Sequence, residues 1–132
     1  MGRNEKRSIK SVFAEKNGED EFTIKRGYAK LIPGRNVLVV EDVLNEGKTV
    51  RKVIKAVRAL KGNVVAVGAI WNRGEVTALD LSGDGQSLTL ISLVNQKLDW
   101  WSEEECPLCM QNIPINREFG KGKEFLARSA DA

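Results

Sequence analysis

The most constraining feature of this sequence is an apolar segment that leads through two acids and a charged loop into a helix. Residues 37–50 read VLVVEDVLNEGKTV. We predict a buried strand over residues 36–40 and a helix over 50–60, where apolar residues recur at helical spacing until Gly62 supplies a stop. Residues 64–70 form another nearly continuous apolar run, typical of a parallel strand buried on both faces. This succession predicts a βαβ unit and therefore an α/β fold.

Further strands are predicted on both sides of this unit. Residues 8–16 and 21–28 are expected to form a hairpin with a charged turn. Residues 79–86 are expected to form a loop, and 88–93 a third core strand. Together these segments predict a mainly parallel, Rossmann-like sheet.

The chain has the size and composition of one globular domain. It has 132 residues, of which 42% are hydrophobic and 30% are charged, and this balance argues against disorder. We expect a single domain over residues 1–132. Within it, residues 94–132 are expected to form an irregular tail with one short helix near 101–106.

Histidine is absent from the sequence, and this absence excludes every mechanism built on imidazole. With only two cysteines, no disulfide framework is implied, so we expect a cytoplasmic protein. No apolar run approaches the length of a membrane span. The basic residues of the predicted helix lack interleaved aromatic residues, so we expect neither a membrane nor a nucleic acid as partner.

The loop between strand and helix carries the residues suited to chemistry. Glu41 and Asp42 sit at the carboxyl end of the predicted strand, where open α/β sheets bind ligands. Residues 45–49 open the helix, whose free amides and positive dipole end suit a phosphate. Adjacent carboxylates suit a sugar diol or a magnesium ion. The loop therefore suits a phosphorylated sugar, although an acidic strand end in a non-binding Rossmann-like domain stays an alternative.

This arrangement resembles the phosphoribosyl pyrophosphate (PRPP) motif of type I phosphoribosyltransferases. The resemblance implies that Glu41 and Asp42 bind the ribose hydroxyls and that the following loop wraps the 5′-phosphate. The family usually has threonines at the positions of Asn45 and Glu46, and a small residue at Lys48. A Glu46 carboxylate about 4 Å from a phosphate charge would cost on the order of 4 kcal/mol at an effective dielectric near 20, unless it points to solvent or Lys48 offsets it. The implied PRPP-binding residues are Glu41, Asp42, Val43, Leu44, Asn45, Glu46, Gly47, Lys48 and Thr49.

Three further segments are similar to bacterial orotate phosphoribosyltransferases. Residues 11–34 resemble their flexible catalytic loop, in which Lys16 would neutralise the departing pyrophosphate. Residues 67–73 resemble a strand that ends in an Asp-Arg pair, whose arginine lies over orotate. This chain has Asn72 in place of the aspartate and Arg73 at the position of the arginine. The tail motif CPLC at 106–109 resembles the family's tail. The resemblance implies Lys16 and Asp42 as catalytic residues, and Asn45 and Arg73 as orotate-binding residues.

The resemblance implies a type I phosphoribosyltransferase fold that lacks its N-terminal elements. The implied activity is that of a glycosyltransferase of pyrimidine nucleotide biosynthesis, which transfers phosphoribosyl from PRPP to orotate and yields orotidine 5′-phosphate and pyrophosphate. Mg²⁺ is the implied cofactor, held by no dedicated protein metal site, and the implied assembly is a homodimer. The alternative is a non-catalytic PRPP- or nucleotide-binding module, or an inactive fragment of such an enzyme.

Two short motifs point elsewhere. Cys106 and Cys109 supply two of the four ligands of a structural zinc site, so such a site would need a second copy of the chain. The sequence leaves open whether these cysteines bind a metal across an interface. Residues 80–85 imitate the start of a calcium-binding loop, but Ile91 stands where that loop needs a glutamate, and a simple turn is the better interpretation.

Overall fold

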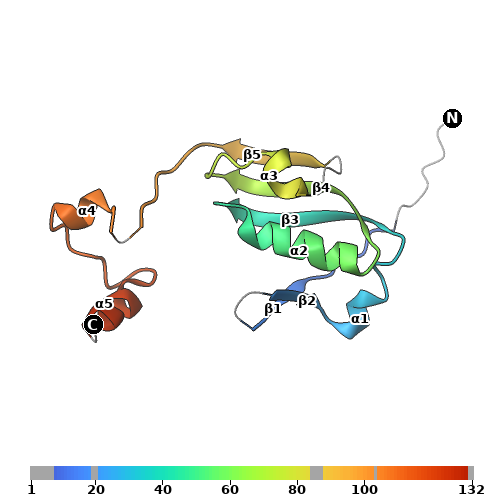
Figure 1. The fold of residues 1–132 in the computed structure, drawn as a ribbon, viewed down its shortest axis with the longest axis horizontal. Helices are drawn as coiled ribbons and strands as arrows, with labels where there is room; N and C mark the ends of the chain where they lie inside the picture. The colour runs from blue at the N-terminus through green and yellow to red at the C-terminus, as the bar shows by residue number, and fades with distance from the viewer. Residues whose placement is uncertain (1–7, 19–20, 84–87, 103, 131–132) are drawn as a thin grey trace. The chain divides into compact units, whose positions relative to one another are not determined.

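A computed structural model describes residues 8–18, 21–83, 88–102 and 104–130 of the chain. It divides into two compact units, Met1–Leu98 and Asp99–Ala132, which are described separately below. Figure 1 labels the elements of both units. Among the described residues, no helix is both long enough and apolar enough to cross a membrane.

The first unit is built on a parallel three-stranded sheet. Its strands β3 (Asn36–Leu44), β4 (Asn63–Asn72) and β5 (Thr89–Asn95) pair in the order β3-β4-β5. The predicted βαβ unit and α/β fold are therefore confirmed. The predicted end of the first strand at residue 40 is wrong, because β4 offers backbone partners as far as Asn72 and β3 pairs with it up to Leu44. The two acids consequently lie within β3 rather than after it.

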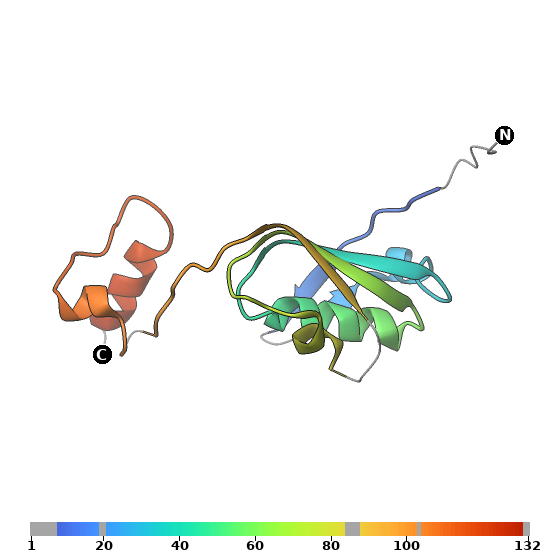
Figure 2. The same cartoon turned by 90° about the horizontal axis from the view of Figure 1, so that it is seen from above.

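Helices cover one face of this sheet. α2 (Lys48–Ala59) lies along β3, and α3 (Ala78–Ser82) lies on the same side over the neighbouring strands (Figures 1 and 2). The periodic apolar residues of α2 point inward, as the sequence predicts. They form one buried core with the inward side chains of the sheet and of α3: Val39, Val50, Ile54, Val57, Val67 and Leu81.

α3 occupies residues 79–82 of the segment predicted as a loop, so that prediction is wrong there, and residues 84–86 lie outside the described residues. A capping box holds its first turn: the Thr77 amide donates to Asp80 Oδ2 at 2.7 Å, and the Asp80 amide donates to Thr77 Oγ1 at 3.3 Å. This reciprocal pattern satisfies two amides that a short helix would otherwise leave unpaired. The Asp80 carboxylate thus caps a helix. The rest of the motif imitating a calcium loop, residues 84 and 85, lies outside the described residues.

The opposite face of the sheet presents apolar side chains to solvent. Parallel strands normally bury both faces, and the near-continuous apolar sequence of these strands fits that expectation. In the structure only the helix-covered face is buried. The exposed apolar side chains of the other face are Leu38, Val40, Val65, Ile70, Ile91 and Leu93, with Val40 at 71% and Leu93 at 80% exposure.

A two-stranded hairpin precedes the sheet. β1 (Ala14–Asn17) pairs antiparallel with β2 (Glu21–Ile24), which confirms the hairpin but with shorter strands than predicted. β2 ends at Ile24 because its last partner is Ala14, where β1 begins. α1 (Arg26–Ala29) then replaces the predicted continuation of the strand.

The second unit contains two helices. α4 (Pro107–Met110) begins at a proline, which fits the first helical position, and α5 (Gly122–Ala130) follows. The helix predicted near residues 101–106 is wrong, since the described residues of that range are not helical and Cys106 serves as the N-cap of α4. α5 also makes the tail more regular than predicted, with Phe125 and Leu126 half-buried.

Candidate functional site

The loop joining β3 to α2 is shaped around Gly47. This residue is the N-cap of α2 and has φ +68°, a left-handed conformation that favours glycine. A Cβ here would also stand 2.7 Å from Leu81 Cδ2 and 3.2 Å from Val76 Cγ1. Because glycine has no side chain to cap the helix, the first amides of α2 receive no side-chain cap. Such a helix start suits an anion.

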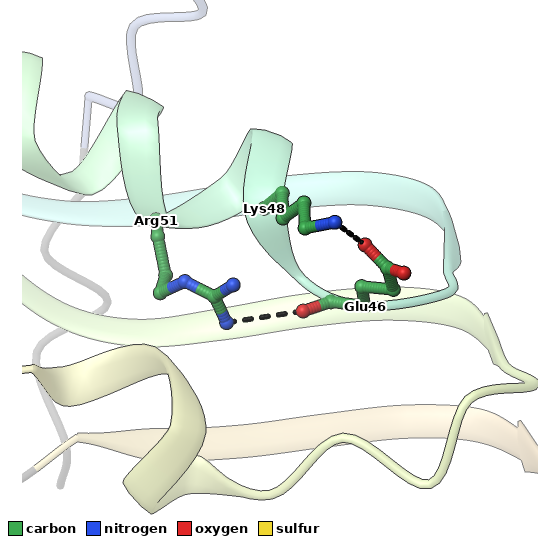
Figure 3. A network of polar contacts seen from close by, with 3 residues as sticks. All are labelled: Glu46, Lys48 and Arg51. Carbon is green, nitrogen blue, oxygen red and sulfur yellow. Dashed lines mark hydrogen bonds and ion pairs between the residues drawn. The ribbon is translucent and has the colours of Figure 1, made fainter.

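Glu46 forms an ion pair with Lys48 across this helix start (Figure 3). Arg51 supports the same loop, since its Nη1 donates to the Glu46 carbonyl oxygen at 3.0 Å and to the Asp80 carbonyl oxygen at 3.2 Å. Of the two expected ways to relieve the charge of Glu46, the structure shows the pairing with Lys48. Arg51 and its tie to α3 were not foreseen, because Asp80 is 29 residues distant in sequence.

The two acids of β3 interact with each other. Glu41 is half-buried and Asp42 is exposed. The Asp42 amide donates to Glu41 Oε1 at 3.2 Å, and the Val43 amide donates to Asp42 Oδ1 at 2.6 Å. Burial raises the pKa of Glu41, and the neighbouring Asp42 carboxyl raises it further by side-chain hydrogen bonding and charge. Two carboxyl groups so close together suit a cation or hydroxyl donors between them.

A second loop, residues 73–76 after β4, is fixed by the buried amide of Asn72. Its Nδ2 donates to the Val76 carbonyl oxygen at 2.8 Å, and its Oδ1 accepts from the Val76 amide at 3.0 Å. An aspartate could make only the second of these bonds. The departure from the family's Asp-Arg pair therefore has a structural role, because Asn72 closes the loop that presents Arg73.

The two loops meet through their backbones. The amides of Arg73 and Gly74 both donate to the Leu44 carbonyl oxygen, at 3.0 and 3.1 Å. Gly74 packs so closely on Asn45 that a Cβ would overlap the Asn45 carbonyl oxygen. These contacts bring Asn45 and Arg73, the two predicted orotate-binding residues, to adjoining positions. Gly74 itself was missed, since sequence shows a glycine but not the backbone it touches.

Arg73 is held by its aromatic neighbour. Its guanidinium carbon lies 5.8 Å from the centroid of the Trp71 ring, and Trp71 Nε1 donates to the Gln96 carbonyl oxygen at 2.8 Å. This stacking orients a planar donor fork next to the loop of Asn45. The Arg73 Nε is buried, and no described residue accepts a hydrogen bond from it.

The sequence of this chain matches a known protein family. The model of the phosphoribosyl transferase domain matches residues 7–106. The chain belongs to the phosphoribosyltransferase domain family. The match spans the hairpin, both loops described above and Cys106, so the candidate site lies wholly within the family domain.

Several curated relatives are named orotate phosphoribosyltransferase. The one from Thermoanaerobacter sp. (strain X514) is 38% identical over 109 residues, which cover 80% of this chain and 52% of the relative. Those from Caldicellulosiruptor bescii and Thermus thermophilus are 38% and 35% identical, over 82% and 80% of this chain and 53% and 54% of their own lengths. The chain therefore spans about half the length of the curated relatives that it matches.

Lys16 lies in the β1–β2 hairpin and not in either of the two loops that form the candidate site. It is exposed on β1 opposite Phe22, and the preceding Glu15 pairs with Lys25 at 2.7 Å. The hairpin lies beside α2 in Figure 1. Its predicted catalytic role and those of the loop residues stay predictions.

A magnesium ion would find only part of its ligands on this chain. Among the described residues, no three His, Cys, Asp or Glu side chains gather to hold a metal. Glu41 and Asp42 offer a carboxylate pair, which fits Mg²⁺ because this ion binds through one or two carboxylates together with phosphate oxygens and water. The donor set fits an ion that arrives with a phosphorylated substrate.

Proposed function

We propose that this chain forms the phosphoribosyl-binding part of an orotate phosphoribosyltransferase. The observation that carries the proposal is the joined pair of loops. The end of β3 offers two carboxylates, and the loop after it offers an uncapped helix start. The loop after β4 offers a stacked arginine fork, and backbone hydrogen bonds from Arg73 and Gly74 to Leu44 join the two loops. The names of the relatives support orotate as the acceptor.

The proposed roles follow from charge and donor geometry. The carboxylates of Glu41 and Asp42 accept hydrogen bonds from the ribose hydroxyls. The first amides of α2 and the Lys48 ammonium hold the 5′-phosphate, and Lys48 exchanges part of its pairing with Glu46 for the phosphate. The Arg73 fork binds the carboxylate or ring carbonyls of orotate.

In the proposed reaction, the bond between ribose C1 and pyrophosphate breaks and a bond from orotate N1 to the same carbon forms, with loss of the N1 proton. Positive charge develops on the ribose ring as pyrophosphate leaves. The carboxylates of Glu41 and Asp42 stabilise that charge by proximity, and fixed binding of both reactants lowers the entropic cost of their encounter. Mg²⁺ would neutralise pyrophosphate charge, and Lys16 would add to this if the hairpin moves over the site.

A second candidate is a PRPP-binding module without transferase activity. The placement of Lys16 on the exposed strand β1, in the hairpin rather than in either of the two loops, favours this reading. In both cases we propose a cytoplasmic protein that works as a homodimer, as the family resemblance implies.

Calorimetry separates the two candidates. PRPP with Mg²⁺ is titrated into the chain, orotate is added, and orotidine 5′-phosphate is measured by chromatography. Binding with product supports the transferase, and binding without product supports the module. Absence of PRPP binding at millimolar ligand would contradict both. The variant Asp42→Asn should weaken PRPP binding, whereas Lys55→Gln, which removes an exposed lysine farther along α2, should not.

A further inference from the structure

Cys106 and Cys109 lie in one tight turn of the second unit. Cys106 is the N-cap of α4 and Cys109 is the third residue of this helix. The turn is closed by backbone hydrogen bonds from Met110 to Cys106 at 3.1 Å and from Ile113 to Leu108 at 3.0 Å. Its conformation is therefore fixed by the backbone and by Pro107, and both thiols are carried on a preformed scaffold.

The two cysteines line a common space. Both cysteines line a cavity of about 330 Å³, whose other lining residues include Trp101, Ile113 and Phe125. The side chain of Cys109 also hydrogen-bonds to Cys106. Two cysteines that are separated by two residues and interact through their side chains can both ligate one metal ion.

The backbone around Cys106 suits a thiolate ligand. Backbone groups of Cys109 and Leu108, together with the Cys109 side chain, form hydrogen bonds with Cys106. Amides that donate to a ligating sulfur act as a second shell around a metal. Neither cysteine is disulfide-bonded, and Cys109 is exposed.

The described residues of one copy do not complete a tetrahedral site. The sequence contains two cysteines and no histidine, and no three potential ligands gather among the described residues. A closed structural zinc site takes four ligands, and sites with four cysteines commonly use this two-residue spacing. Two copies of the turn supply four thiolates, which a two-fold axis can place around one ion.

We propose that Cys106 and Cys109 of two copies of this chain bind one zinc ion through four thiolates. The site joins the second units of the two copies. It uses none of the residues of the candidate phosphoribosyl site, so its test does not depend on the transferase activity. Zinc binding would also shield the thiols from oxidation, because ligated thiolates are withheld from disulfide exchange.

The test uses the full chain, purified under reducing conditions and then dialysed with Zn²⁺ alone. We expect one zinc for every two chains by elemental analysis, and a dimer in sedimentation that separates when a chelator is added. Co²⁺ in place of Zn²⁺ should give the visible absorption of a tetrahedral ion with four thiolates. Loss of a second-shell group commonly lowers metal affinity about 10–100-fold, so Cys106→Ser or Cys109→Ser should lower it at least as much. Gln111→Ala, an exposed change in the same turn, should leave it unchanged.

Two results would overturn the proposal. One is no bound zinc, with both thiols of the dialysed protein still open to alkylation. The other is one zinc per chain without a metal-dependent dimer, which would indicate two thiolates completed by water or a carboxylate. Circular dichroism of the serine variants shows whether the fold is kept, and the chelator and cobalt measurements on the unaltered chain do not depend on any variant.

Discussion

Gly74 lies against the backbone of Asn45, so that the loop after β4 rests directly on the loop after β3. We predict that Gly74→Ala separates the two loops, because a Cβ would overlap the Asn45 carbonyl oxygen and backbone cannot turn aside as a side chain can. Overpacking typically costs about 1–3 kcal/mol, and we expect the upper part of that range in urea unfolding. Gly27→Ala is the control, since a Cβ there meets nothing within 4 Å. Equal stability of the two variants would show that the loops are not locked together.

Asn72 gives a second prediction. The Asn72 side chain is only 6% exposed, and Asn72→Asp preserves its size. The substitution removes the donor to the Val76 carbonyl oxygen and places a negative charge in a buried position. Breaking one such hydrogen bond and leaving its partner unsatisfied costs about 1–3 kcal/mol. Unfolding at neutral pH should therefore need less denaturant than for Asn63→Asp, an exposed asparagine that bonds to Asn36. An unchanged midpoint for Asn72→Asp would contradict the role given to Asn72.

These two contacts show where sequence reasoning reaches its limit. The strand, helix and strand around residues 36–70 were predictable because apolar periodicity reflects burial. The true end of β3 was not, since Glu41 and Asp42 carry no apolar signal while backbone pairing with β4 continues. α3 is too short for a period, although its Thr77–Asp80 capping pattern was a readable signal. The contact of Gly74 with Asn45 joins segments that are distant in sequence, and neither segment contains a pattern that predicts it.

Glu41 provides a pH-dependent prediction. Its pKa is raised in the folded state, first by burial and then by Asp42, so the folded state binds more protons than the unfolded state between the unfolded and folded pKa values. Stability contributed by this group is therefore present below its unfolded pKa and is lost as pH rises through its folded pKa. We expect Glu41→Gln to be more stable than the unaltered chain at neutral pH, and the difference to vanish in acid. Urea unfolding across pH tests this, with Glu118→Gln, an exposed carboxyl in the second unit, as control. A difference independent of pH would contradict the assignment.

Substitutions of the two partners of the Glu46–Lys48 ion pair should have opposite effects on PRPP binding. Glu46→Gln removes a negative charge beside the proposed phosphate position and frees the Lys48 ammonium. Both groups are partly exposed, so we expect a modest effect of about 1.4 kcal/mol, which is roughly tenfold tighter PRPP binding. Lys48→Gln should weaken binding by a similar factor. Calorimetry at low and high salt measures both, and changes of the same sign would contradict a phosphate held at this helix start.

The central claim is that the start of α2 holds the 5′-phosphate while the adjoining loop presents Arg73. The most direct measurement is the amide nuclear magnetic resonance spectrum of the labelled chain during addition of PRPP with Mg²⁺. We predict that the amide signals of residues 47–50 shift first and furthest, and that those of Arg73 and Gly74 follow because they are bonded to Leu44. Saturating shifts that spare residues 47–50 and appear only elsewhere, or no shifts at millimolar PRPP, would contradict it.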